Sequence, residues 1–178
     1  MENKIGTFKE IYGDLFEEIF SEKYDVSLQG CNCFNCQGAG IVIPFKKYFN
    51  TDKFPMEMKG KGDINKLGQI DCKEFYLKNR KVYDLPIGVP GIECHMITIC
   101  NCYSQYHYGK NHEDGISMPA DYEALTLCLR KINFKYKTKK VVLPLICGGL
   151  AGGDPDIIRN IIKTELKNCD VTLVIFNK

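Results

Sequence analysis

Hydrophobic and polar residues along the 178-residue chain follow two spacings, one typical of strands and one typical of helices. Short apolar runs rich in β-branched residues predict strands, whereas apolar residues spaced three or four positions apart predict helices. We expect strands over residues 7–12, 24–31, 68–77, 80–87, 95–103, 141–146 and 170–176. We expect helices over residues 38–49, 119–134 and 154–166, with polar, irregular segments at 49–68 and 104–117.

The order of these elements indicates the fold class. Strands dominate the first half, and the second half alternates strand, helix, strand, helix and strand, which is typical of an α/β sheet with helices on its faces. The third helix has the best-marked start, with Asp154 as N-cap and Pro155 at its first position. In the first helix, Pro44 is tolerated only in the first turn. Ligands of such sheets bind beyond the carboxyl ends of the strands.

Two glycine-rich segments fall at such strand ends, each before a predicted helix. They read CGGLAGGD at residues 147–154 and QGAGI at residues 37–41. Glycine lets a ligand approach the backbone N–H groups closely, and a helix N-terminus attracts anions. The pair therefore predicts a phosphate or diphosphate site. Neither segment contains the GK[ST] of a P-loop, and GAG at 38–40 lacks the third glycine of a dinucleotide fold.

Five motifs occur in one order over nearly the whole chain. They are YGDLF (12–16), LQGCNCFNCQGAGI (28–41), KGDINKLGQI (61–70), DYEAL (121–125) and CGGLAGGD (147–154). In these residues the sequence resembles the macro domain family, in its compact stand-alone form from bacteria or phages. The resemblance implies one three-layer α/β/α domain over residues 1–178, with a mixed central sheet.

The resemblance also implies a binding site for ADP-ribose or a related nucleotide. Asp14, with Leu15 beside it, matches the aspartate that accepts from the adenine amino group, and Phe176 matches the aromatic residue that stacks on adenine. Asn32 matches the asparagine near the distal ribose. The residues implied around the diphosphate are Gly38, Ala39, Gly40, Ile41, Gly148, Gly149, Leu150, Ala151, Gly152 and Gly153. From the residues alone, Asp14 could instead cap a turn, Asn32 could be a satisfied strand-end amide, and Phe176 could belong to the core.

The implied activity is hydrolysis of a phosphate, acyl or ADP-ribosyl ester at the distal ribose, as in ADP-ribose 1″-phosphate phosphatases. Asn32 would orient the water. The lysine and aspartate of a glycohydrolase branch correspond here to Gln105 and Ala151, and no side chain is an obvious general base. His107 and His112 lie in the loop near the expected site. The alternative is a non-catalytic reader, and an ADP-ribosylated macromolecule is a further candidate partner.

Composition bears on the remaining function classes. The net charge of +2 predicts neither a nucleic-acid nor a membrane partner, and KYKTKK (135–140) is read as a solvated loop. The N-terminus has no apolar signal region, so we expect a cytoplasmic protein. The ten cysteines are then reduced thiols, and no cofactor or metal is expected. The alternative is a zinc or redox site at Cys31, Cys33 and Cys36.

Overall fold

The computed structural model describes residues 5–54, 62–84, 93–108 and 119–176. These residues form strands, α-helices and two 3₁₀ helices, η1 and η2. The strands are Phe8–Tyr12 (β1), Val26–Asn32 (β2), Ile70–Lys78 (β3), Lys81–Tyr83 (β4), His95–Gln105 (β5), Lys140–Pro144 (β6) and Asp170–Ile175 (β7). The helices are Leu15–Ile19 (α1), Val42–Phe49 (α2), Thr51–Lys53 (η1), Ile64–Lys66 (η2), Tyr122–Lys135 (α3) and Pro155–Glu165 (α4).

The strands form one seven-stranded sheet in the order β1-β7-β6-β2-β5-β3-β4. Strands β1, β7, β6, β2 and β5 are parallel to one another, and β3 and β4 complete the sheet as antiparallel partners. The mixed sheet expected from the sequence is therefore confirmed. Because five parallel strands end at the same edge, the segments that follow them are brought together there.

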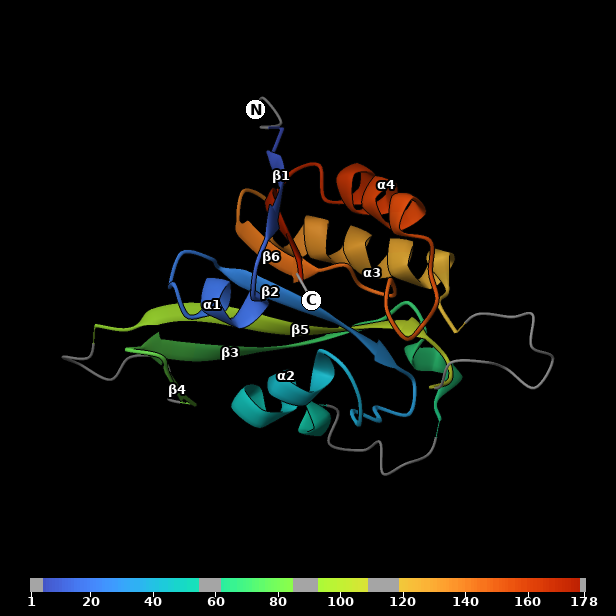
Figure 1. Cartoon of the computed structure of the whole chain (residues 1–178), viewed down its shortest axis with the longest axis horizontal. Coiled ribbons are helices and arrows are strands. Elements are labelled where there is room, and N and C mark those ends of the chain that lie inside the picture. The colour runs from blue at the N-terminus through green and yellow to red at the C-terminus, as the bar shows by residue number, and fades with distance from the viewer. Residues whose placement is uncertain (1–4, 55–61, 85–92, 109–118, 177–178) are drawn as a thin grey trace.

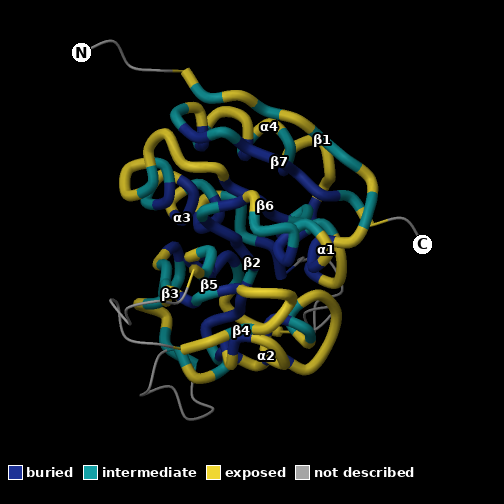
Figure 2. Tube along the Cα trace, turned by 90° about the vertical axis from the view of Figure 1, so that its left-hand side faces the viewer, coloured by how far each residue is buried: buried dark blue, intermediate teal, exposed yellow. Residues whose placement is uncertain are grey.

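Helices cover both faces of the sheet, which gives three layers. Figure 1 shows α3 and α4 on one face and α1 and α2 on the other. On the first face, Leu129 of α3 and Ile162 of α4 pack in one apolar cluster with Leu143 of β6. On the second, Phe45 of α2 packs in a separate cluster with Ile97 of β5. Buried positions accordingly concentrate in the strands between the helical layers (Figure 2).

The α-helices begin in two different ways. Asp14, Asp121 and Asp154 each accept a hydrogen bond from a backbone N–H in the first turn of α1, α3 and α4. Each cap gives a hydrogen-bond acceptor to one or two of the four backbone N–H groups that have no partner within the helix at its start. Helix α2 has no side-chain cap from Ile41, the residue before it. The Ile43 N–H donates to the Gly40 carbonyl at 3.2 Å and Pro44 has no N–H, so the N–H groups of Ile41 and Val42 are the ones left for another acceptor at this helix start.

The structure departs from the sequence-based expectations in several places. Helix α1 was not expected, because no element was predicted between the first strand, which ends at Tyr12, and the second, which begins at Tyr24. The segment at 49–68 was expected to be irregular, yet it contains η1 and η2. Strand β5 continues to Gln105, beyond the expected end at Tyr103. Residues 55–61 and 85–92, and 109–118 of the expected long loop, lie outside the described residues.

Several expected boundaries were also displaced. Helix α2 begins at Val42 rather than at residue 38, because Gly40 has a positive φ that no α-helix allows. Strand β6 ends at Pro144 and β7 ends at Ile175, one or two residues before the predicted ends. In the described ranges, no helix is both long enough and apolar enough to cross a membrane.

Candidate functional site

The residues singled out in the sequence follow neighbouring parallel strands. Asp14 comes after β1 and Phe176 after β7. The second glycine-rich segment, Cys147 to Gly153, comes after β6. Asn32 ends β2 and the first glycine-rich segment follows it, while Gln105 ends β5. These five strands are adjacent in the sheet in that same order, so the candidate residues form one row along the carboxyl edge.

Asp14 stands at one end of this row and caps α1. Its Oδ1 accepts from the Phe16 N–H at 2.6 Å and from the Glu17 N–H at 3.3 Å. Its Oδ2 has no hydrogen-bond partner within the described ranges, and the side chain is exposed. Leu15 is buried, so it has only backbone atoms to offer a ligand. The capping role considered for Asp14 is therefore real, and it leaves one carboxylate oxygen open.

Phe176 lies beside Asp14 through the pairing of β1 with β7. Tyr12 is in register with Ile175, and the Gly13 N–H donates to the Ile175 carbonyl at 2.9 Å. Phe176 is 69% exposed, so it does not belong to the core. An aromatic face and an open carboxylate oxygen thus occur side by side at this end of the row.

Asn32 organises the start of the first glycine-rich segment. Its Oδ1 accepts from the Phe34 N–H at 3.1 Å and the Cys36 N–H at 3.0 Å, and its Nδ2 donates to the Cys36 carbonyl at 2.8 Å. The amide is buried and used within its own loop. One N–H of Nδ2 is left over in this arrangement, because an amide nitrogen carries two. The proposed role in orienting a water would have to use that N–H.

A chain of buried amides then holds the segment in place, and sequence reasoning did not find it. The Gln37 Oε1 accepts from the Thr51 hydroxyl at 2.6 Å, and the Gln37 Nε2 donates to the Asn35 Oδ1 at 2.9 Å. Asn35 in turn donates to the Asp52 carbonyl at 2.8 Å. The signal in the sequence was the density of amides, three within residues 32–37. This network fixes the backbone that leads into Gly38.

The glycines of the first segment are exposed at the start of α2. A Cβ added at Gly38 would meet no atom within 4 Å, so open space lies next to its backbone. Gly40 has φ of +74°, a conformation that side chains disfavour. Ala39 and Ile41 are exposed as well. The segment therefore presents bare backbone beside a helix start that has no side-chain cap.

The second glycine-rich segment is packed more tightly. The Gly153 N–H donates to the Cys147 carbonyl at 2.9 Å, and a Cβ at Gly153 would lie 2.9 Å from that same oxygen. A Cβ at Gly148 would lie 2.5 Å from the Cδ2 of Leu145. At Gly149 a Cβ would again meet nothing within 4 Å. The segment is thus a compact turn in which Gly149 faces open space.

The two glycine-rich segments approach each other. A Cβ built on Gly40 would lie 3.7 Å from the Cδ1 of Leu150, which is half exposed. Ala151, by contrast, is buried, and its carbonyl accepts from the Ala120 N–H at 3.2 Å. The two segments therefore lie close enough together for one ligand to contact both.

The other end of the row contains amides. Asn32 is in register with Gln105 across a bulge between β2 and β5. Gln105 donates through Nε2 to the His107 carbonyl at 2.8 Å, and the Nδ1 of His107 lies 2.7 Å from the Tyr108 carbonyl oxygen. His112 lies outside the described residues. In the described part of this end, the amides of Asn32 and Gln105 thus lie at neighbouring strand ends, with His107 next along the chain.

The thiols near the site are protonated at neutral pH. The Cys147 Sγ donates to the Ser104 hydroxyl at 3.0 Å, and burial raises the pKa of this thiol to about 12. Burial likewise raises the pKa of Cys33 to about 11, and that of Cys31 well above its usual value. Unlike these two buried thiols, Cys36 is exposed. No three His, Cys, Asp or Glu residues within the described ranges are grouped as metal ligands would be, so the zinc alternative gains no support.

Known proteins resemble this chain in sequence and in fold. No family model matches the sequence. A protein of Enterobacteria phage T4, named as an uncharacterised 17.5 kDa protein of the tk–vs intergenic region, is 29% identical over 174 residues, which are 93% of this chain and 94% of that protein.

Solved structures show the fold. Thermosipho africanus DarTG in complex with ADP-ribose is 15% identical, with a TM-score of 0.65 over 95% of this chain and 41% of that one. A variant of the Oceanobacillus iheyensis macrodomain with ADPR is also 15% identical, with a TM-score of 0.59 over 100% of this chain and 89% of that one. The chain therefore has the macrodomain fold.

Proposed function

We propose that this chain binds ADP-ribose, or a close derivative of it, along the carboxyl edge of the sheet. The observation that carries the proposal is the order of the groups along that edge. Asp14 and Phe176 come first, the two glycine-rich segments lie in the middle, and the amides of Asn32 and Gln105 come last. ADP-ribose presents adenine, diphosphate and distal ribose in this same order.

The first end suits adenine. The open Oδ2 of Asp14 can accept a hydrogen bond from the adenine amino group, and an ionised acceptor makes such a bond strong. The exposed ring of Phe176 offers a surface for stacking. Neither group needs to leave its place in the fold to do this, since Asp14 caps α1 through its other oxygen.

The middle of the row suits the diphosphate. The uncapped start of α2 offers backbone N–H groups and the positive end of a helix dipole. Open space next to Gly38 and Gly149 lets phosphate oxygens approach from both segments. Two solved structures of this fold contain ADP-ribose according to their descriptions, which supports the assignment.

Calorimetric titration with ADP-ribose, with AMP as control, tests the proposal. We expect micromolar binding of ADP-ribose and much weaker binding of AMP, because AMP lacks the second phosphate and the distal ribose. Equal affinity for both would show that the distal half of the ligand is not recognised. No heat with either ligand would contradict the proposal as a whole.

Hydrolysis of a phosphate or acyl group on the distal ribose is a second proposed function of the same site. Its support is the uncapped start of α2, because preorganised N–H groups stabilise charge that develops in a transition state. Asn32 would orient the attacking water through its remaining Nδ2 N–H. Incubation with ADP-ribose 1″-phosphate should then release inorganic phosphate, and Asn32→Ala should abolish that release. Tight binding without release would instead indicate the non-catalytic reader.

A further inference from the structure

The last turn of α3 and the segment that follows it form a strongly cationic surface. Residues 130–140 contain six lysine or arginine residues and no acidic one. The whole chain has 24 basic and 22 acidic residues, so the rest of it has 24 − 6 = 18 basic residues against the same 22 and a net charge of −4. The low total of +2 therefore conceals a marked separation of charge, which favours an anionic partner at this one surface.

An aromatic side chain lies among these cations. Phe134 is 79% exposed, the second-highest exposure among the large hydrophobic residues of the described ranges. The Lys137 ammonium lies 5.6 Å from the centre of the Phe134 ring. A single exposed aromatic ring is common on protein surfaces, so its meaning here depends on the cations and the groove beside it. The exposed Phe134 ring and the Lys137 ammonium thus lie close together on the surface.

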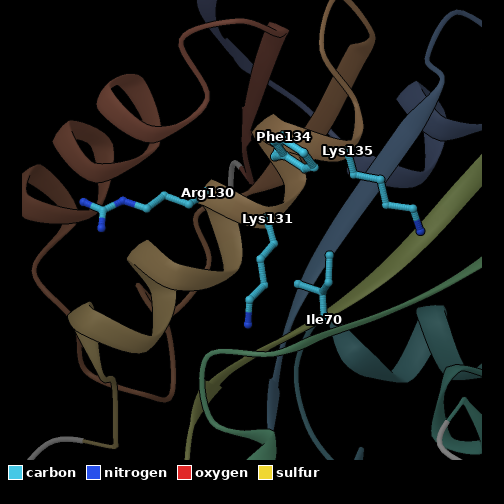
Figure 3. A pocket seen from close by; sticks show the side chains of 5 residues that line it. All are labelled: Ile70, Arg130, Lys131, Phe134 and Lys135. Atoms are coloured by element: carbon cyan, nitrogen blue, oxygen red, sulfur yellow. The ribbon is translucent and has the colours of Figure 1, made fainter.

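An open groove of about 520 Å³ adjoins this ring, and it is lined by Ile70, Arg130, Lys131, Phe134 and Lys135. Figure 3 shows Lys131 running alongside Ile70, while Arg130 points in another direction. The Lys131 ammonium donates to the Gly68 carbonyl at 2.7 Å and to the Gln69 Oε1 at 2.5 Å, which are both uncharged acceptors. The groove thus combines an apolar wall with a fixed cation.

Most of this charge is not neutralised inside the protein. Arg130 pairs with Glu165 at 2.8 Å, and Lys139 lies 4.0 Å from Asp25. For Lys131, Lys135 and Lys137, the described residues supply no carboxylate oxygen within 4 Å. These three charges surround Phe134 in the sequence and remain available to an anion from outside.

We propose that this surface binds single-stranded nucleic acid. Proteins that bind single strands combine a cationic groove along the backbone with aromatic rings on which bases stack. Phe134 would stack on a base, and Lys131, Lys135 and Lys137 would contact the flanking phosphates. The surface shares no residue with the proposed nucleotide site, and the two lie at opposite ends of β6, because Lys140 begins that strand and Cys147 follows it.

The test measures fluorescence anisotropy of a labelled deoxythymidine oligomer of about 15 nucleotides, a length near the upper site sizes of single-strand binders. We expect binding at low salt that weakens steeply between about 50 and 200 mM salt. A duplex of the same length and vesicles containing phosphatidylserine are measured alongside. No binding to the single strand at low salt would overturn the proposal, as would tighter binding to the duplex or to the vesicles.

Matched variants separate specific contacts from net charge. Lys135→Glu with Lys137→Glu should weaken binding at least tenfold. Lys78→Glu with Lys81→Glu changes the net charge equally at two exposed lysines of the β3–β4 hairpin, and it should have little effect. Equal losses in the two double variants would overturn the proposal, because binding would then follow net charge alone.

A second pair of variants tests stacking. Phe134→Leu keeps an apolar side chain but removes the ring, and it should weaken binding about 5-fold or more, whereas Phe134→Tyr should bind like the wild type. Equal affinity in both would exclude stacking and overturn the proposal. Since Phe134 is exposed, both variants should fold, and unchanged ADP-ribose titrations would show that they have.

Discussion

The first glycine-rich segment leads into a helix that has no side-chain cap, whereas Asp154 caps the helix after the second. Asp154 accepts from the Asp156 N–H at 2.8 Å and the Ile157 N–H at 3.1 Å. At the start of α2 the N–H groups of Ile41 and Val42 therefore still need an acceptor, whereas the start of α4 already has one. Glycine-rich turns that look alike in sequence thus differ in how much of their backbone remains for a phosphate.

The glycines themselves differ in the same sense. Gly153 leaves no room for a Cβ beside the Cys147 carbonyl, so it is needed for packing whether or not a ligand binds, whereas a Cβ at Gly148 would require the Leu145 side chain to move. Gly38 and Gly149 face open space, so nothing within the described structure requires them to be glycine. This difference separates a structural role from a binding role within the same short motif, and variants can test it.

The largest effects are expected from two valine substitutions in the second segment. Gly149→Val should leave stability nearly unchanged and weaken ADP-ribose binding about 100-fold, a loss of about 3 kcal/mol, because the side chain fills space assigned to the diphosphate. Gly153→Val should destabilise the fold by about 1–3 kcal/mol through overpacking. Urea unfolding and calorimetry measure the two quantities. If Gly149→Val bound normally, the second segment would have no part in binding.

Asp14 allows its two roles to be separated. Asp14→Asn keeps an oxygen for the cap of α1 but places an N–H where the adenine amino group should donate. We expect about tenfold weaker ADP-ribose binding with little change in stability. Asp14→Ala should lose the same affinity and also about 0.5–2 kcal/mol of stability through loss of the cap. Normal affinity in the Asn variant would contradict the adenine assignment.

The uncapped helix start predicts a smaller effect. Ile41→Asp places a negative charge at the first turn of α2, where the phosphate is expected. Binding should weaken about fivefold, the equivalent of about 1 kcal/mol, while the helix dipole favours the new charge in the free protein. Ile41→Asn is the neutral control and should bind nearly as well as the wild type. Equal affinities for both variants would show that α2 does not contact the phosphate.

The smallest effect on stability at neutral pH is expected from ionisation of Cys147, the buried thiol of the second segment. An unfolded thiol has a pKa near 9.0, and burial raises the pKa of Cys147 to about 12. Above pH 9 the unfolded chain loses a proton that the folded chain keeps, so stability should fall as the pH rises from 9 toward 12. Thermal melts should therefore be flat from about pH 6.5 to 8.5. A loss of stability in that lower range that Cys147→Ala removes would indicate a Cys147 thiolate in the folded state.

The sequence was sufficient for the fold class and for most strands, because their apolar runs are long and their order is typical of α/β proteins. Helix α1 was missed, although Asp14 followed by apolar residues at Leu15, Phe16, Ile19 and Phe20 has helical spacing. Its five residues are too few to stand out beside a strand. Tertiary packing of these side chains against α2 decides that it forms.

For the candidate site, the sequence motifs located segments that meet at the carboxyl edge of the sheet, but they did not show the structural role of each residue. That Gly149 is open and Gly153 is not depends on Cys147 and Ile158, which only the folded backbone brings near. The support of the first segment by Gln37 and Thr51 likewise depends on a contact across 14 residues. The exposed position of Phe176 follows from its location just beyond the end of β7.

The most direct test of the central claim is a titration of isotope-labelled protein with ADP-ribose, followed through backbone amide shifts in NMR spectra. The account predicts the largest shifts at the amides of Gly38, Gly40, Ile41 and Gly149, where phosphate oxygens would accept hydrogen bonds. Smaller changes should occur around Asp14 and Phe176. Saturable binding with no shift in either glycine-rich segment would contradict the claim that the diphosphate binds between them.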